Sequence, residues 1–431
     1  MSKHRDIPQT FHPNLKTWDF TGICMLFLYL LNPHTPISLQ NRRITCSLTC
    51  LDFFSYHRVG VTKVIQYFVG RNLGHLCRCV ANVQKYQEKK DKNLPVEVEV
   101  YAFKHAHQWL RTNLPQTKIR TFNKEVLEKD KRSFLMAKLI MHDWRKEVES
   151  LKNARGKKGP IIGGVYHSDL FVGGDDSDWT ARFKEEVHEI SEKTTDVFFH
   201  MNLTQPQRTP KLSTFYLPIP IIAREPIRSP RKVKEMLGLS VDEPFLLIHM
   251  GGGMGPFRYK YMEEWFEKIK GLKTNYKIVV ASQFGGVMEK FPKQIIQAPL
   301  FSNGSDLIHA ADLVISKPGM GVMIDCIATG TPLLALPADT KERQVKNMML
   351  RDLIGSDLCL VPHQASAKEL KRQIELVEAF SPQIQAVFQR IPKNGSEVVA
   401  ECMKLLSKHS LKELPDLYPQ LQTLTPFLVK G

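Results

Sequence analysis

The sequence predicts an α/β protein built from two Rossmann-like domains of mostly parallel sheet. Apolar strand-like segments alternate with amphipathic helical segments through most of the chain. Two of the strand segments run directly into glycine-containing turns that open helices, an arrangement that places a ligand site at the carboxyl edge of a parallel sheet. The length of 431 residues also exceeds one typical core and favours two domains.

In the first domain the alternation begins near Val61. Val96, Val98 and Val100 alternate with glutamates, as in a half-buried strand. The expected strands are residues 63–69, 96–103, 160–166 and 196–199, and the expected helices are 75–90, a long amphipathic helix within 124–151, and 178–193.

A stiff, proline-rich segment at residues 217–222 (LPIPII) is expected to link the two domains. The expected strands beyond it are residues 245–250, 276–281, 312–316, 332–336 and 357–361, and a closing helix is expected at 395–407. The resulting division is an unassigned extension at 1–60, a first domain at 61–222, a second domain at 223–408 and a tail at 409–431.

The amino-terminal extension contains an apolar run at Gly22–Leu31. This run is shorter than the roughly 20 residues that a membrane span requires, and Pro33 and Pro36 follow it. Three interpretations stay open: an extension, a membrane-touching segment, or an unreliable gene start.

The clearest functional motif lies at residues 310–347, in the order strand, glycine turn, helix, strand and polar loop. Gly319 and Gly321 break the strand so that the next helix begins with free backbone N–H groups, which attract phosphate. Met323 and Ile327 share one helix face, which leaves Asp325 on another face, where its carboxylate can accept hydrogen bonds from two sugar hydroxyls.

This motif resembles the donor-binding half of family 28 glycosyltransferases. Their pattern of serine, basic residue, small residue, glycine and an acid six residues later is matched from Ser316 to Asp325, with aspartate in place of the usual glutamate and Met320 where a small residue is common. The resemblance implies the two-domain GT-B fold, with the reaction in the cleft between the domains, 61–222 on the acceptor side and 223–408 on the donor side. It also implies a UDP-sugar donor, inversion at the anomeric carbon and no essential metal or other cofactor. The donor-binding residues that we expect are Gly252, Gly253, Ser316, Lys317, Gly319, Met320, Gly321, Asp325, Gln344 and Asn347.

A second glycine loop follows the first strand, with Gly70, Asn72 and Gly74 leading into His75. In the resembled family an equivalent loop faces the cleft from the acceptor domain. His75 is the first candidate for the general base, since imidazole titrates near working pH. Asp169, which follows a strand at the same edge, is the second candidate. A histidine that only bonds its own turn, and an aspartate that only caps a helix, are the alternatives.

The charge balance favours anionic partners. The chain has 60 basic and 44 acidic residues, a net charge of +16, so a nucleoside diphosphate or an anionic membrane surface suits it. The basic residues are dispersed and no RNA- or DNA-binding motif occurs, so nucleic acid is not expected. The eight cysteines lack a paired zinc spacing and are expected to be reduced thiols, which fits a cytoplasmic chain or one peripheral to a membrane.

Three other functions remain alternatives. Asp176 and Asp178 are two carboxylates that a metal-dependent transferase would use, although an N-cap role fits them as well. A nucleotide-sugar epimerase has the same architecture, and a non-catalytic nucleotide-sugar-binding subunit would keep the pocket without the reaction. The sequence does not indicate whether the acceptor is a lipid, a saccharide or a small molecule.

Overall fold

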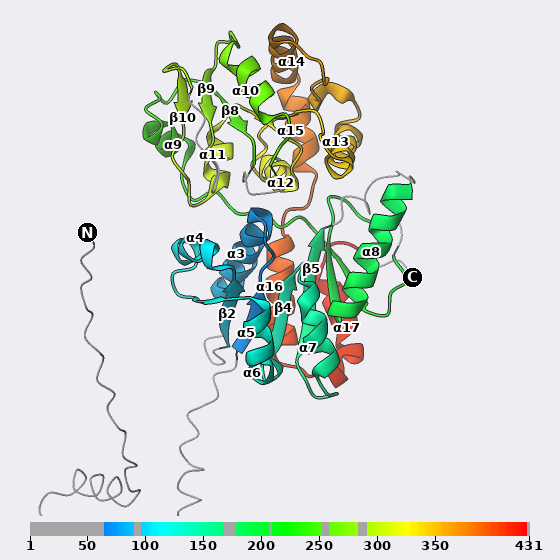
Figure 1. Cartoon of the computed structure of the whole chain (residues 1–431). Helices are drawn as coiled ribbons and strands as arrows, with labels where there is room; N and C mark the ends of the chain where they lie inside the picture. Colours follow the sequence, from blue (N-terminus) through cyan, green and yellow to red (C-terminus); the bar gives the residue numbers. More distant parts are fainter. Residues whose placement is uncertain are drawn as a thin grey trace, which may run out of the picture. The chain divides into compact units, whose positions relative to one another are not determined.

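The computed structural model describes residues 64–89, 96–167, 178–206, 209–251, 258–282 and 291–428. The extension at 1–60 and its apolar run lie outside these residues. Two sheets organise the described chain, one of seven strands and one of five, and every pairing within them is parallel. The predicted α/β class with two Rossmann-like sheets is therefore confirmed (Figure 1).

The first sheet has the strand order β3-β2-β1-β4-β5-β6-β7. Its strands are β1 (Val64–Phe68), β2 (Glu97–Ala102), β3 (Lys118–Thr121), β4 (Leu139–Asp143), β5 (Ile161–His167), β6 (Val197–Met201) and β7 (Phe215–Ile219). The helical segments that connect them are α3 (Leu73–Glu88), η1 (Lys104–Ala106), α4 (His107–Asn113), α5 (Lys124–Lys129), α6 (Lys131–Leu135), η2 (Lys146–Val148), α7 (Glu149–Ala154) and α8 (Asp178–Thr194).

The two faces of this sheet are covered by different helices because side chains alternate along each strand. Tyr67 on β1 packs in the same cluster as Leu76 and Val80 of α3. The neighbouring Phe68 points to the other face, in a cluster with Leu127 of α5 and Leu151 of α7. The central strands β4, β5 and β6 are buried along almost their whole length, as expected for a parallel sheet covered on both faces, whereas the edge strand β3 is mostly exposed.

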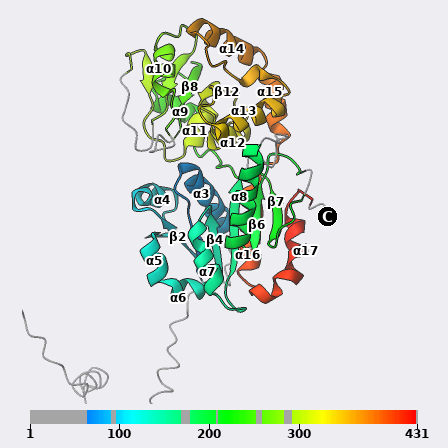
Figure 2. The same ribbon diagram turned by 45° about the vertical axis from the view of Figure 1, so that its right-hand side comes forward.

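The second sheet has the strand order β10-β9-β8-β11-β12. Its strands are β8 (Phe245–His249), β9 (Lys277–Val280), β10 (Ile295–Gln297), β11 (Leu313–Ser316) and β12 (Leu333–Ala335). The helical segments of this part are α9 (Pro230–Met236), α10 (Met262–Lys270), α11 (Gly304–Ala310), α12 (Met320–Thr329), α13 (Lys341–Ile354), η5 (Asp357–Cys359), α14 (Ala367–Ala379) and α15 (Ser381–Gln389). Figure 2 shows α13, α14 and α15 following one another on one side of this sheet.

The chain then returns to the first sheet. Helix α16 (Gly395–Leu406) packs on α3 and β7, and α17 (Leu414–Leu424), which follows η6 (Leu411–Glu413), packs on β7. In Figure 1 both helices lie beside the first sheet. Thr425 supports this return, because its hydroxyl donates to the carbonyl of Pro218 at 2.6 Å. The domain division expected from the sequence differs from this arrangement, because it places 395–407 in the second domain and treats 409–431 as a tail.

Three expected elements differ in the structure. The long helix within 124–151 is wrong: this stretch forms α5, α6, strand β4 and α7. Helix caps explain the break, because the Asn123 side chain accepts from the Val126 N–H and the chain turns again at Asp130. The apolar run Leu139–Asp143 then fits the centre of the sheet, between β1 and β5, and a short apolar run does not by itself distinguish a buried strand from a helix.

The expected linker at 217–222 is partly a strand, since β7 pairs with β6 at the edge of the first sheet. Pro218 has no N–H to donate, and an edge strand tolerates this because one of its sides has no neighbour. The expected strand at 357–361 is instead the short helix η5, followed by a single bridge between Ala335 and Leu360. Among the described helices, none combines the length and the apolar character that crossing a membrane requires.

Candidate functional site

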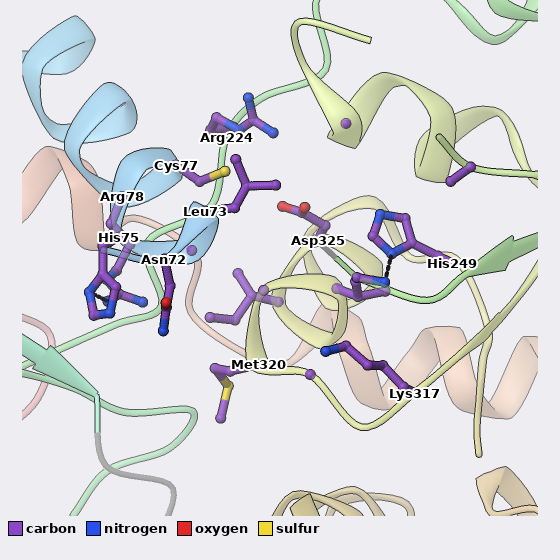
Figure 3. A pocket seen from close by; sticks show the side chains of 18 of the residues that line it. Asn72, Leu73, His75, Cys77, Arg78, Arg224, His249, Lys317, Met320 and Asp325 are labelled. Atoms are coloured by element: carbon purple, nitrogen blue, oxygen red, sulfur yellow. Dashed lines mark hydrogen bonds between the residues drawn. The ribbon is translucent and has the colours of Figure 1, made fainter. Parts of the chain in front are cut away.

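A cavity of about 290 Å³ lies where the carboxyl ends of the two sheets meet. Its lining comes from the turn after β1 and from α3 on one side, and from the turn after β11 and from α12 and α13 on the other. Figure 3 shows His75 and Arg78 on the first side and Lys317, Met320 and Asp325 on the second. The two predicted glycine turns therefore line one cavity, although they are far apart in the sequence.

The amino terminus of α12 forms an anion-binding wall. Gly319 is the N-cap, its backbone is extended with φ −145°, and no side chain caps the helix. The first intrahelical bond joins the Met323 N–H to the Gly319 carbonyl at 3.1 Å, so the preceding amide groups have no partner within the helix. Gly319, Met320 and Gly321 all line the cavity, as expected for residues that approach a phosphate.

Lys317 adds positive charge to this wall. Burial, together with the nearby charges of Arg343 and Lys346, lowers the pKa of Lys317 to about 8. Arg343 bonds both oxygens of Asp339, and Lys346 bonds Glu342 at 2.5 Å. A bound diphosphate would offset the mutual repulsion of the three cations.

His249 and Gly251 stand next to Lys317. The Gly251 N–H donates to His249 Nδ1 at 3.1 Å, so the ring proton is on Nε2. Burial lowers the pKa of His249 to about 4, which keeps the ring neutral. Gly251 has φ +79°, a backbone conformation that residues with a Cβ rarely adopt, and the Lys317 side chain occupies the space where a Cβ would lie. His249 is thus a neutral donor on the cavity wall.

Asp325 also lines the cavity, one turn into α12. Its helix neighbours Met323 and Ile327 are buried in the core, as the spacing predicted. Burial raises the pKa of the Asp325 carboxyl to about 6, while the positive charge of Arg224 acts in the opposite direction. The carboxylate is therefore the prevailing form at neutral pH.

The opposite wall holds a histidine–aspartate pair. His75 Nδ1 lies 2.5 Å from Asp143 Oδ1, and Arg78 donates to both Asp143 oxygens at 2.8 Å. Burial would raise the pKa of Asp143, but the charges of Arg78 and His75 hold it well below its usual range. An ionised Asp143 accepts the Nδ1 proton, which leaves the lone pair of Nε2 as the base.

Burial also lowers the pKa of His75, with Asp143 opposing the shift. The ring is thus neutral at pH 7 and able to accept a proton. Gly70 makes the geometry possible, because a Cβ there would come within 2.6 Å of His75 Cγ and 2.8 Å of the Asp143 carbonyl. Asn72 and Gly74 line the cavity beside His75.

Some predicted residues lie away from the cavity wall. Ser316 is buried, and its hydroxyl donates to the His249 carbonyl at 2.7 Å, so it supports the loop from beneath. Gln344 is exposed, and Asn347 bonds the Leu336 carbonyl at 3.1 Å. Neither lines the cavity, whereas Glu342, Arg343 and Lys346 of the same helix do. The residues that fall outside the described chain are Asp169, Asp176, Gly252 and Gly253.

Sequence reasoning missed Asp143, Arg78, Arg224 and His249. Asp143 ends a strand that was predicted as helix, and a carboxylate directly after an apolar run (LIMHD) is the signal that would have found it. His249 likewise ends β8. Arg224 follows the predicted linker, and no sequence pattern marks it.

Comparison with known proteins agrees with this geometry. Residues 266–404 match the model of the glycosyltransferase family 28 C-terminal domain. Two curated relatives are UDP-N-acetylglucosamine–N-acetylmuramyl-(pentapeptide) pyrophosphoryl-undecaprenol N-acetylglucosamine transferases. The one from Christiangramia forsetii is 24% identical over 192 residues, covering 40% of this chain and 49% of the relative. The one from Prochlorococcus marinus is 30% identical over 142 residues, covering 31% of this chain and 38% of the relative. The chain thus spans less than half the length of these relatives.

Solved structures share the fold at low sequence identity. A UDP-glucosyltransferase from Polygonum tinctorium aligns with TM-score 0.56 and 10% identity, covering 80% of this chain and 99% of that one. A spinosyn forosaminyltransferase aligns with TM-score 0.52 and 12% identity, with coverage of 80% and 99%. The fold is therefore the two-domain GT-B fold of glycosyltransferases.

Within that class, residues 266–404 are similar to the C-terminal domain of glycosyltransferase family 28. The resemblance predicted from the segment between Ser316 and Asn347 is confirmed.

Proposed function

We propose that this chain transfers a sugar from a UDP-sugar donor to a hydroxyl group of an acceptor, with inversion at the anomeric carbon and without a metal ion. One observation carries the proposal: a base held by a carboxylate, His75 with Asp143, lines the same cavity as the amides that open α12 and have no partner within the helix. The first group suits an acceptor hydroxyl, and the second suits a leaving diphosphate. The names of the curated relatives, which specify a UDP-sugar donor, support the donor assignment.

The chemistry follows from the two walls. His75 Nε2 accepts the proton of the acceptor hydroxyl while its oxygen attacks the anomeric carbon from the face opposite the diphosphate. The bond between the anomeric carbon and the diphosphate oxygen breaks, and that oxygen keeps the electron pair. The amides of α12 and Lys317 stabilise the charge on the departing UDP. The proton remains on His75, where Asp143 stabilises the imidazolium, and the attack from the opposite face inverts the configuration.

Metal independence is supported by the positive groups that the chain itself supplies. Lys317, Arg343 and Lys346 line the cavity beside the start of α12. Transfer that continues at an unchanged rate in EDTA would agree with this part of the proposal. Loss of transfer in EDTA, restored by a divalent cation, would contradict it.

Binding of the donor is tested first by thermal unfolding with a panel of nucleotide sugars. A ligand at 100 times its dissociation constant adds about 2.7 kcal/mol to the free energy of unfolding, which shifts the melting temperature measurably. Stabilisation by UDP-sugars, and not by other nucleotide sugars, is the expected result. No response to any UDP-sugar would overturn the donor assignment.

Two substitutions then separate the walls. His75→Ala is expected to lower kcat roughly a hundredfold or more with little change in UDP affinity, as for loss of a general base. Asp325→Asn is expected to lower the affinity for UDP tenfold or more and to leave the affinity for pyrophosphate nearly constant. The reason is that a charge-assisted hydrogen bond, here from a ribose hydroxyl to the carboxylate, contributes about 1.5 to 3 kcal/mol. A reversed pattern would show that the donor and acceptor walls are exchanged.

The acceptor is proposed to be a lipid or a saccharide presented at an anionic membrane surface. The net charge of +16 supports this, as does the lipid-linked acceptor in the names of the curated relatives. We expect the protein to sediment with anionic vesicles more than with neutral vesicles, and less so at high salt. Equal sedimentation with both kinds of vesicle would contradict the charge argument.

A further inference from the structure

Arg224 occupies an unusual position in the cavity. It lies shortly after β7, where the chain passes from the first sheet to the second, and its side chain is only 7% exposed. The guanidinium is held from both sides. Nη1 donates to the Ser302 carbonyl at 3.1 Å, and the group lies 5.4 Å from the ring centre of Trp109 on α4. Gly304 leaves room beside it, since a Cβ there would come to 3.7 Å from Nη2.

The guanidinium of Arg224 keeps unused hydrogen-bonding capacity. Within the described residues, Nε is buried and has no hydrogen-bond partner. Arg224 is among the residues that line the cavity. Buried donors in folded proteins are almost always bonded, so this incompletely bonded guanidinium, on a residue that lines the cavity, points to a ligand acceptor.

Asp325 is the acidic side chain opposite Arg224. Figure 3 shows the carboxylate of Asp325 and the guanidinium of Arg224 on the same side of α12, with no hydrogen bond drawn between them. The described residues include no ion pair between the two, although each affects the electrostatics of the cavity and Arg224 opposes the rise in the pKa of Asp325. Two opposite charges thus line one space without bonding each other.

Other cavity or near-cavity arginines differ from Arg224. Arg228 is paired with Asp306 at 2.7 Å, and Arg343 is paired with Asp339. Each of these guanidinium groups bonds a carboxylate of the chain, whereas no ion pair of Arg224 occurs among the described residues. Arg224 therefore has the donor capacity that a ligand requires.

We propose that Arg224 and Asp325 form a clamp for vicinal hydroxyl groups, with Asp325 accepting from the hydroxyls and Arg224 donating to their oxygens. This inference rests on the proposed function, in which the hydroxyls are those of the donor ribose. A ribose hydroxyl donates one hydrogen bond and accepts others, so it satisfies an acid and a guanidinium at once. Because Arg224 belongs to the segment between the sheets and Asp325 to α12, the clamp draws ligand contacts from both. It makes Arg224 a determinant of donor specificity.

The test uses the full chain, the substitution Arg224→Met and calorimetric titration with UDP, 2′-deoxy-UDP and pyrophosphate. Methionine keeps an apolar stem next to Trp109 and removes only the guanidinium. Arg224→Met is expected to lose tenfold or more in UDP affinity, to bind pyrophosphate as the wild type does, and to discriminate less between UDP and its deoxy form. Arg224→Lys, which keeps the charge but not the fork of donors, is expected to recover part of the loss. Arg111→Met is the matched control, since Arg111 is exposed on the same helix as Trp109 and does not line the cavity.

The outcomes distinguish this inference from the proposed function. If the wild type binds UDP and Arg224→Met binds it equally well with the same deoxy discrimination, the clamp is refuted and the donor site stands. If the wild type binds no uridine nucleotide, both are refuted. The double variant with Asp325→Asn should lose less than the product of the single losses, because the two side chains act on the same hydroxyls. Losses that multiply would show that the residues act independently, against the clamp. If Arg224→Met does not fold, Arg224→Lys is titrated with the same three ligands, and wild-type affinity with unchanged deoxy discrimination would refute the clamp.

Discussion

Replacing Asp143 with asparagine removes the carboxylate that holds both His75 and Arg78. The carboxylate is fully buried and accepts from His75 Nδ1 at 2.5 Å and from Arg78 Nε and Nη2 at 2.8 Å each. An amide offers one oxygen in place of two and carries no charge, so the buried guanidinium of Arg78 loses its counter-charge. Breaking a buried ion pair in this way costs about 3 to 5 kcal/mol in the free energy of unfolding.

The same substitution also acts on the reaction. Without an ionised Asp143, the Nδ1 proton of His75 is no longer held, and the tautomer with a protonated Nε2 cannot accept from the acceptor hydroxyl. In the Ser-His-Asp triad, the corresponding change from aspartate to asparagine lowers kcat about 10⁴-fold. We expect kcat to fall about 10²- to 10⁴-fold here, with UDP affinity changed by less than about twofold, since Asp143 lies on the wall opposite α12.

The assay measures kcat and the UDP dissociation constant below the melting temperature, and the free energy of unfolding by urea titration. Asp196→Asn is the matched control. Asp196 is also buried and paired with an arginine, Arg155, and it accepts from the Ile162 N–H at 2.8 Å, but it precedes β6 and so lies at the opposite edge of the sheet. Asp196→Asn should lower stability and leave kcat nearly unchanged. The reasoning is refuted if the Asp143 variant retains kcat within about threefold, or if both variants lose kcat equally.

Three further predictions concern single groups. Gly319→Val should fold normally, because a Cβ at this position meets only the Lys317 carbonyl, at 3.7 Å. Its UDP affinity should nevertheless fall about tenfold or more, because the valine side chain covers the α12 amides. A calorimetric titration that gives an unchanged dissociation constant for UDP would contradict this prediction. Between about pH 7 and 8, UDP affinity should be nearly constant. Above pH 8 it should fall by up to tenfold per pH unit, because the ammonium of Lys317, with a pKa of about 8, binds the diphosphate and its neutral amine does not. Lys317→Met should remove this loss, and an identical pH profile would count against the residue. Burial lowers the pKa of His142 and of His200 to about 3 in the folded protein. The unfolded chain therefore binds protons at these residues more readily than the folded protein does. The free energy of unfolding that the two residues contribute is fully present above pH 6.5 and is lost as the pH falls. Together the two histidines should lower the free energy of unfolding by about 3 kcal/mol between pH 7.5 and 5.5. Urea titrations should show a smaller decrease over this pH range in His200→Gln than in the wild type.

Local patterns predicted the parts of the site that depend on one turn of chain. The strand before Gly319, the helix after it and the position of Asp325 follow from apolar spacing and a glycine break within about twenty residues. The same holds for His75 at the start of α3. These residues were named from the sequence because each motif contains its own signal.

The fourth strand shows where such patterns are insufficient. Leu139–Asp143 is a short apolar run that suits either a helix or a buried strand, and the choice depends on neighbours far along the chain. In the structure β1 and β5 pair on its two sides, and only then does Asp143 lie beside His75. Gln344 and Asn347 show the same limit, since helical spacing groups residues by face but does not say which face meets a cavity.

By itself, the sequence indicated the α/β class, the two glycine turns and the resemblance of the second domain to family 28, and it singled out His75, Lys317 and Asp325, which line the cavity. Tertiary structure alone decided that His75 meets Asp143 across 68 positions, that Arg224 faces Asp325, and that α16 and α17 return to the first sheet. The physical reason is the distance along the chain over which each interaction acts. Side-chain periodicity, glycine conformation and helix amides act within a few residues, whereas strand order and helix packing are settled by burial of the whole chain, which brings together groups that no local pattern relates.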